Sequence, residues 1–143
     1  MVKEGTNRLS PVEEGLFTPP PYTESPPKLL GGYCRKCRQH YFPRPRHCRR
    51  CLDPVEGASL GSEGKLYSFT VIRTRPPLGL PQPYGVGYVD LEECGLRIFG
   101  LLDPGAVDRL RIGLPVRLAV APLGHDARGE RCLRPYFTPM EAD

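Results

Sequence analysis

Alternating apolar and polar positions predict five short β-strands in the second half of the chain, separated by segments rich in Gly and Pro. The strands are expected at residues 65–74, 84–91, 96–102, 116–121 and 133–138. The first contains many β-branched and aromatic residues, which favour strands. In the fourth, Val116, Leu118 and Val120 share one face and should point inward. In the second, the missing side chains of Gly85 and Gly87 predict a close neighbour.

A short helix is expected between the third and fourth strands. Asp103 followed by Pro104 is typical of a helix N-terminus, and the helix should end near Leu110. Five strands in this order, with a helix between the third and fourth, form an OB-fold barrel. Closing the barrel removes the exposed strand edges that a small open sheet would have.

The first 27 residues show no hydrophobic periodicity. Six prolines interrupt them, and Leu16, Phe17 and Tyr22 are isolated apolar residues. We therefore expect residues 1–27 to form an extended proline-rich arm, either disordered or ordered by lying across a partner.

Four of the six cysteines form two C-x-x-C pairs that are ten residues apart: Cys34, Cys37, Cys48 and Cys51. This spacing predicts two knuckles that hold one zinc ion through four thiolates. Four protein ligands leave no open coordination position, so the zinc should be structural.

We assign residues 28–56 to a zinc ribbon and residues 57–143 to the OB-fold domain. Leu29 and Leu30 should begin a strand of the ribbon, and residues 41–47 should form a hairpin tip between the knuckles. Gly and Pro between residues 53 and 64 predict a linker.

Disulfides, a redox-active C-x-x-C pair and bound iron are the alternatives at the four cysteines. Disulfides need an oxidising compartment, and no βαβ pattern supports a redox site. Iron stays open, because four thiolates also suit it. No glycine follows Cys37 or Cys51, which leaves the geometry of both turns open. His40 and His47 are expected at the surface.

Composition is that of a globular protein whose basic charge is concentrated in the ribbon. The 143 residues include 18 prolines and 16 glycines, which disfavour long helices. No apolar run is long enough to cross a membrane, and no targeting segment is recognisable, so we expect a cytoplasmic protein. Residues 28–51 contain eight Lys/Arg and no Asp/Glu, whereas the rest has twelve Lys/Arg and sixteen Asp/Glu.

No catalytic set is apparent outside the ribbon. The only candidate nucleophiles there are Cys94 and Cys132, with His125 as the only imidazole, and we expect both thiols to be ordinary free cysteines. The adjacent acids Glu92 and Glu93 fit a solvated turn. The chain is therefore not expected to be catalytic alone.

Several motifs, in this order, resemble one family. The two C-x-x-C pairs precede GKLYSFTV, PYGVGYVDL, RIGLPV and PYFTP. Together these resemble the acyl-CoA-associated OB-fold proteins with an N-terminal rubredoxin-like zinc ribbon, across residues 28–139. The resemblance implies a non-catalytic accessory subunit of a thiolase-superfamily enzyme. Such an enzyme cleaves or forms carbon–carbon bonds in a 3-oxoacyl-CoA or similar thioester, as in aromatic or steroid degradation.

The same resemblance implies a thiolase-like partner subunit in a hetero-oligomer, and coenzyme A as a possible ligand. Arginines suit the phosphates of coenzyme A because they form charge-assisted, bidentate hydrogen bonds. The candidate phosphate-binding residues are Arg44, Arg46, Arg49, Arg50, Arg73 and Arg75. Tyr84, Tyr88 and Phe99 suit either an adenine platform or, as we expect, the barrel core.

The main alternative function is single-stranded nucleic-acid binding, because a basic zinc ribbon next to an OB-fold also fits that role. Net acidic charge outside the ribbon disfavours a groove that follows phosphates. A pure scaffold that stabilises an enzyme fits the sequence equally well.

Overall fold

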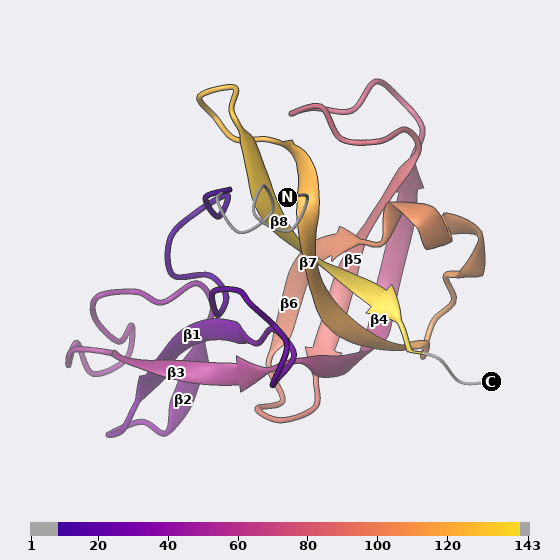
Figure 1. Cartoon of the computed structure of the whole chain (residues 1–143). Coiled ribbons are helices and arrows are strands. Elements are labelled where there is room, and N and C mark those ends of the chain that lie inside the picture. The colour runs from indigo at the N-terminus through magenta and orange to yellow at the C-terminus, as the bar shows by residue number, and fades with distance from the viewer. Residues whose placement is uncertain (1–8, 141–143) are drawn as a thin grey trace.

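The computed structural model describes residues 9–140, which form two β-sheets (Figure 1). The smaller sheet has the order β2-β1-β3. It consists of β1 (Leu29–Cys34), β2 (Gln39–Tyr41) and β3 (Glu56–Gly61). The larger sheet is a closed barrel in the order β4-β5-β6-β8-β7. Its strands are β4 (Glu63–Ile72), β5 (Tyr84–Leu91), β6 (Arg97–Leu102), β7 (Pro115–His125) and β8 (Arg131–Pro139).

This barrel confirms the predicted mainly-β fold, since five strands in the order first-second-third-fifth-fourth form an OB-fold. The predicted helix is present as a 3₁₀ helix, η1 (Pro104–Arg109), rather than an α-helix. The Asp103 side chain accepts a hydrogen bond from the Gly105 amide at 2.9 Å, as expected of an N-cap. Ala106 has non-helical dihedral angles, which prevent a regular helix.

The hairpin between β7 and β8 is longer than the apolar alternation predicts. Strand β7 continues to His125 and β8 begins at Arg131. The Asp126 carboxylate accepts hydrogen bonds from the amides of Arg128 and Glu130, at 2.9 and 3.0 Å. These bonds close a turn in five residues, so the strands on both sides extend further than their hydrophobic residues do.

The linker expected between residues 53 and 64 is wrong, because residues 56–61 form β3, which pairs with β1. Leu60 is fully buried, which anchors this otherwise small and polar strand. The hairpin tip expected at residues 41–47 is wrong as well. The turn between β1 and β2 is the first knuckle itself, and residues 42–46 connect β2 to the second knuckle.

The expectation that the arm is disordered or needs a partner is wrong for residues 9–27; residues 1–8 lie outside the described part. Phe17 is only 6% exposed and belongs to the main core cluster. The Val12 amide donates to the Leu133 carbonyl at 2.8 Å, and the Leu30 amide donates to the Leu16 carbonyl at 2.8 Å. Backbone bonds to both β1 and β8 therefore fix the arm across its own chain.

The main core lies inside the barrel and extends to the ribbon. Val116 and Leu118 are buried as predicted, with Val120 packed against them. Leu29 of β1 and Leu60 of β3 belong to the same cluster as these barrel residues. A second, smaller cluster surrounds the cysteines and includes Cys34, Cys48 and Val55. The ribbon therefore has one apolar end shared with the barrel and one end built around thiols.

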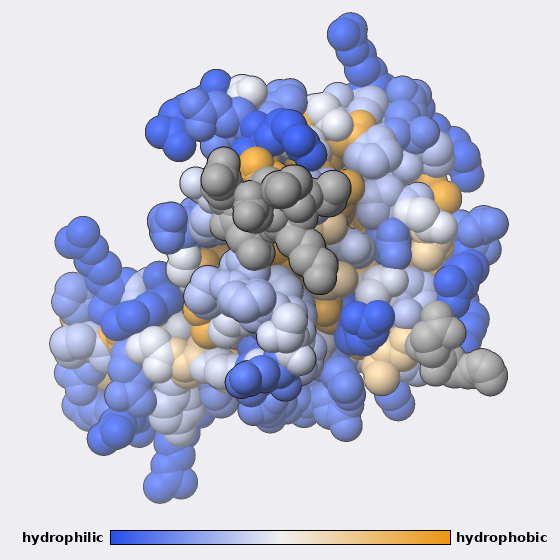
Figure 2. All heavy atoms as spheres, in the orientation of Figure 1, coloured by the Kyte–Doolittle hydropathy of each residue, from blue (hydrophilic) through white to orange (hydrophobic). Residues whose placement is uncertain are grey.

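Hydrophilic residues cover most of the face drawn in Figure 2, and hydrophobic residues reach it mainly in the middle of the view. The predicted close approach at β5 is present, since a side chain at Gly87 would collide with the Ser68 carbonyl. No helix in the part of the chain that the structure describes is long and apolar enough to span a membrane.

Candidate metal centre

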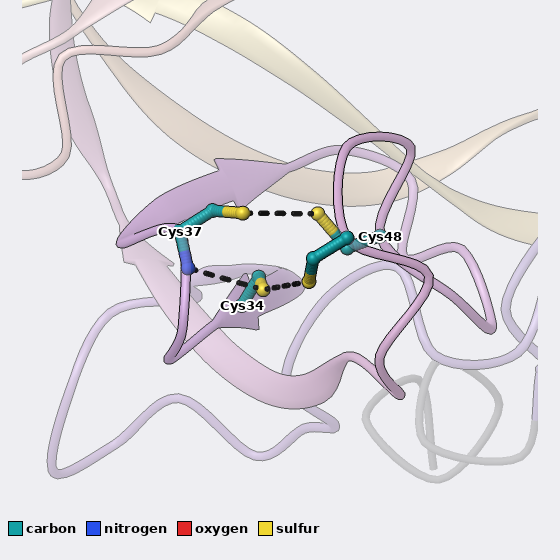
Figure 3. A group of neighbouring side chains, drawn as sticks. Cys34, Cys37 and Cys48 are labelled. Carbon is teal, nitrogen blue, oxygen red and sulfur yellow. Dashed lines mark hydrogen bonds between the residues drawn. The ribbon is translucent and has the colours of Figure 1, made fainter.

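All four predicted ligands converge at the end of the ribbon. Cys34 ends β1, Cys37 lies in the turn that follows, and Cys48 and Cys51 belong to the second knuckle. Their sulfurs lie within 4.8 Å of one another. Figure 3 shows three of these side chains directed toward a common centre between the two knuckles.

Distances between the sulfurs test whether a metal fits. Cys34 Sγ lies 3.5 Å from Cys51 Sγ, and Cys37 Sγ lies 3.7 Å from Cys48 Sγ. Four sulfurs at about 2.3 Å from a tetrahedral zinc ion would be about 3.8 Å apart, whereas a disulfide requires about 2.05 Å. All six cysteines are free thiols. The spacing therefore fits a four-thiolate zinc ion and excludes disulfides between these sulfurs.

The two knuckles form without glycine. Arg38 and Leu52 each follow the second cysteine of a pair, and their φ angles are +55° and +68°. The Leu52 amide donates to the Cys48 carbonyl at 2.9 Å, which closes the second turn. A residue with a Cβ atom in this left-handed region costs about 1–2 kcal/mol. The sequence departs from the common pattern at these positions, and the backbone adopts the turn at an energetic cost.

Differences in hydrogen bonding and burial give the thiols of the metal centre different pKa values. The Tyr41 hydroxyl lies 3.2 Å from Cys48 Sγ, and the Arg50 amide donates to the same sulfur at 3.4 Å. The hydrogen bond from Tyr41 is the main cause that lowers the pKa of Cys48 to about 6. Desolvation and neighbouring thiols raise the pKa of Cys37 to about 12. Bound zinc deprotonates its thiol ligands outright and would override this difference. No sequence signal pointed to Tyr41.

Both histidines of the ribbon lie outside the ligand set. The His40 ring packs against Tyr33 with centroids 4.7 Å apart. His47 is exposed, as expected. Among the described residues, the metal-binding group contains only the four cysteines.

The candidate coenzyme A arginines fall into two separate groups. Arg46, Arg49 and Arg50 are exposed around the second knuckle. Arg44 is exposed too, but its Nε donates to the Val55 carbonyl at 3.0 Å, so its side chain also stabilises the ribbon.

Arg73 and Arg75 follow the end of β4. Figure 1 places that loop at the opposite end of the molecule from the ribbon. The six side chains therefore cannot bind one diphosphate together.

The two remaining thiols have different surroundings, and neither forms a hydrogen bond to an imidazole in the described structure. Cys132 is fully buried, and its sulfur lies 3.8 Å from an Arg134 nitrogen. Cys94 is partly buried in the turn after β5. The His125 Nδ1 atom lies 3.3 Å from the Asp126 carbonyl oxygen. A thiol–imidazole pair of the kind that activates a nucleophile is thus not formed by these residues.

Of the three aromatic residues expected in the core, only Tyr84 is buried. Tyr88 is 44% exposed and Phe99 is 57% exposed, so the core expectation is wrong for both. Gly87 and Val89 occupy the inward positions of β5, and this alternation leaves Tyr88 on the outer face.

A four-thiolate ribbon joined to a closed five-stranded OB-fold barrel defines the class of this protein. Two family models match the chain in this order. Residues 25–56 match the ChsH2 rubredoxin-like zinc ribbon domain, and residues 58–121 match the ChsH2 C-terminal OB-fold domain. The chain therefore belongs to the ChsH2-type family of zinc-ribbon OB-fold proteins, which confirms the resemblance inferred from the motifs.

Curated relatives include the benzoylsuccinyl-CoA thiolase subunit BbsA of Thauera aromatica, 40% identical over 95 residues. The BbsA subunit of Geobacter metallireducens is 39% identical over 98 residues. The matches cover 66% and 68% of this chain, and in both cases 64% of the relative's length. The solved structure of an Ltp2-ChsH2(DUF35) aldolase is similar, with a TM-score of 0.62 and 28% identity, covering 78% of this chain and 84% of that chain.

Proposed function

We propose that this chain is a non-catalytic accessory subunit of a thiolase-superfamily enzyme that acts on CoA thioesters. The observation that carries the proposal is its 40% identity to a protein named as a subunit of benzoylsuccinyl-CoA thiolase. The metal centre agrees with a supporting role, since four protein ligands leave zinc no position for substrate or water. The reaction is thiolytic cleavage, or the reverse carbon–carbon bond formation, of a 3-oxoacyl-CoA or similar thioester, in aromatic or steroid degradation.

The partner is a thiolase-like subunit that supplies the nucleophilic cysteine and its base. This division of labour follows from the surroundings of Cys132 and Cys94, neither of which has an imidazole partner in the described structure. The complex belongs in the cytoplasm, where a reducing environment keeps six free thiols reduced.

Co-expression with the thiolase-like protein encoded nearest to this chain tests the proposal. We expect the two proteins to co-elute in size-exclusion chromatography and to cleave a 3-oxoacyl-CoA in the presence of free CoA. Separate elution would refute the proposal. So would full stability and activity of the thiolase-like protein alone.

Coenzyme A contact is proposed for the ribbon arginines Arg46, Arg49 and Arg50. They are exposed and belong to residues 28–51, which contain eight Lys/Arg and no Asp/Glu, although the exposed Asp53 follows three residues after Arg50. Arg49→Gln combined with Arg50→Gln should raise the KM for CoA about tenfold with little change in kcat, because uniform binding of phosphate is lost. Arg111→Gln, an exposed arginine before β7, is the matched control. An unchanged KM for CoA would show that these ribbon arginines do not bind coenzyme A.

Single-stranded nucleic-acid binding is the second candidate, and the exposed rings of Tyr88 and Phe99 favour it. These residues lie on β5 and β6, the second and third barrel strands, where OB-folds stack bases. We expect only weak binding at about 0.15 M salt, because phosphate contacts are salt-sensitive. A sub-micromolar Kd for an oligonucleotide at that salt would replace the accessory-subunit proposal.

A further inference from the structure

The outer face of β4, β5 and β6 carries an uncovered patch of apolar side chains. The strand register places Tyr88 opposite Phe99 and Val86 opposite Leu101. The rings of Tyr88 and Phe99 meet edge to face, with centroids 5.2 Å apart. On β4, the small residues Ser68 and Thr70 face Tyr88 and Val86. We call Tyr67, Val86, Tyr88, Phe99 and Leu101 the aromatic patch.

Tyr67 is fixed at one edge of the patch by a charged pair. The Arg97 guanidinium lies 3.4 Å from the centre of the Tyr67 ring. Arg97 also donates to both Asp90 carboxylate oxygens, at 2.6 and 3.1 Å. A bidentate pair and a cation–π contact hold three side chains in one arrangement before any partner arrives. This reduces the side-chain entropy that docking would cost.

The aromatic patch continues into a groove of about 390 Å³. Val86, Phe99 and Leu101 line the groove from the barrel, and the arm and ribbon line it with Leu16 and Phe42. The arm bridges β1 and β8 and borders the groove with Val12 and Leu16, while Tyr88 and Phe99 stay 44% and 57% exposed. A groove beside exposed rings offers a partner a recess for an inserted apolar side chain.

We infer that the aromatic patch is the surface against which the thiolase-like subunit docks, an inference that rests on the proposed function. Exposed aromatic residues with an adjoining arginine are the residues that dominate protein–protein binding energy. The charge of the patch disfavours a nucleic acid. Arg97 is neutralised by Asp90, which leaves Lys65 beside them in the same row. The adjoining groove adds one cation, Arg134, and one acid, Glu13, whereas single-strand grooves need several free cations. The occupant is therefore a protein surface with apolar side chains at its centre.

The experiment compares variants in the co-expressed complex. Tyr88→Ser with Phe99→Ser should weaken the Kd for the thiolase-like subunit at least about 30-fold, as expected for central aromatic contacts. Ile112→Ser is the matched control, because Ile112 is 72% exposed but lies outside the aromatic patch. The control should change the Kd less than about threefold. Circular dichroism and zinc content verify that each variant is folded.

Hydrogen exchange of the wild-type complex provides a test that needs no variant. Complex formation should slow exchange in residues 86–101 and leave residues 111–113 unchanged. If the wild-type proteins bind but the double variant retains the wild-type Kd, or residues 86–101 gain no protection, the docking surface is wrong and the proposed function stands. If the wild-type proteins do not bind, the proposed function fails and the docking surface fails with it. The docking surface would also be wrong if the wild-type protein self-associates or binds an oligonucleotide and the double variant abolishes that binding.

Discussion

Replacing Leu52 by glycine should tighten zinc binding, although Leu52 is not a ligand. Leu52 has a φ angle of +68° and is 71% exposed, so its side chain makes little contact that glycine would lose. Relieving the left-handed conformation gains about 1–2 kcal/mol. The greater freedom of glycine in the unfolded chain takes back about 0.5–1 kcal/mol. Subtracting the centre of the second range from the centre of the first leaves a net gain of about 0.5–1 kcal/mol in the folded knuckle.

This gain should appear in the zinc affinity because metal binding and folding of the ribbon are coupled. A gain of about 0.5–1 kcal/mol corresponds to a Kd about two- to fivefold lower. Arg38→Gly, at a φ angle of +55°, should behave alike, and the double variant should approach the product of the two effects. The measurement is competition for zinc with a chromophoric chelator at neutral pH.

Lys36→Gly is the matched control, since Lys36 is exposed in the first knuckle and lacks a positive φ angle. There glycine brings only its entropic cost, so the Kd should rise about two- to fivefold. If Leu52→Gly weakens zinc binding as Lys36→Gly does, the left-handed turn at Leu52 carries no recoverable strain and the reasoning fails.

Three further outcomes test the arm, the metal and the charged pair. Phe17→Ala should lower the free energy of unfolding in urea by about 3–5 kcal/mol, because Phe17 is buried. Phe99→Ala should lower it by less than about 1 kcal/mol, because Phe99 is exposed. Equal losses would contradict the packing of the arm. Chelating the zinc should speed hydrogen exchange in residues 34–55 but leave exchange in residues 58–61 unchanged, because Leu60 packs in the barrel core. Equal loss of protection in both segments would show that the ribbon depends entirely on the metal. Arg97 lowers the pKa of Asp90 in the folded protein. The Asp90–Arg97 pair therefore stabilises the fold fully when the pH is above the ordinary pKa of Asp90. This stabilisation is lost as the pH falls through the lowered pKa of the folded state. Asp90→Asn should therefore cost less than about 1 kcal/mol at pH 7, because the pair is exposed. The cost should shrink as the pH falls through the lowered pKa of Asp90, and a cost that does not change with pH would implicate another contact.

The features that the sequence predicts correctly are those in which one local pattern suffices. The spacing of Cys34, Cys37, Cys48 and Cys51 defines the ligand set, because a C-x-x-C turn brings two sulfurs to one side. The barrel strands were predictable because alternation such as that of Val116, Leu118 and Val120 survives folding.

The features that the sequence pattern does not predict depend on contacts between distant segments. Strand β3 (EGASLG) has one large apolar residue, Leu60, and exists because β1 pairs with it. Phe17 has no apolar neighbour at a regular spacing, and its burial comes from β1, whose Leu29 forms a bridge with it. Alternation in β5 separates Tyr88 from Val89 but does not state which face points inward. The packing of Val89 in the core decides that question.

The position of the arm determines how the ribbon and the barrel can act together. Its residues bridge Leu29 of β1 and Leu133 of β8, and Phe17 lies in the cluster that joins the ribbon to the barrel core. The arm, the ribbon and the barrel are thus held by a shared core and by backbone hydrogen bonds, not by the zinc ion alone. A subunit that docks on the aromatic patch would meet the ribbon arginines in a fixed relative position. Substitutions that loosen the arm, with Phe17→Ala as the sharpest, should therefore impair docking and coenzyme A contact together, although Phe17 is buried and belongs to neither surface.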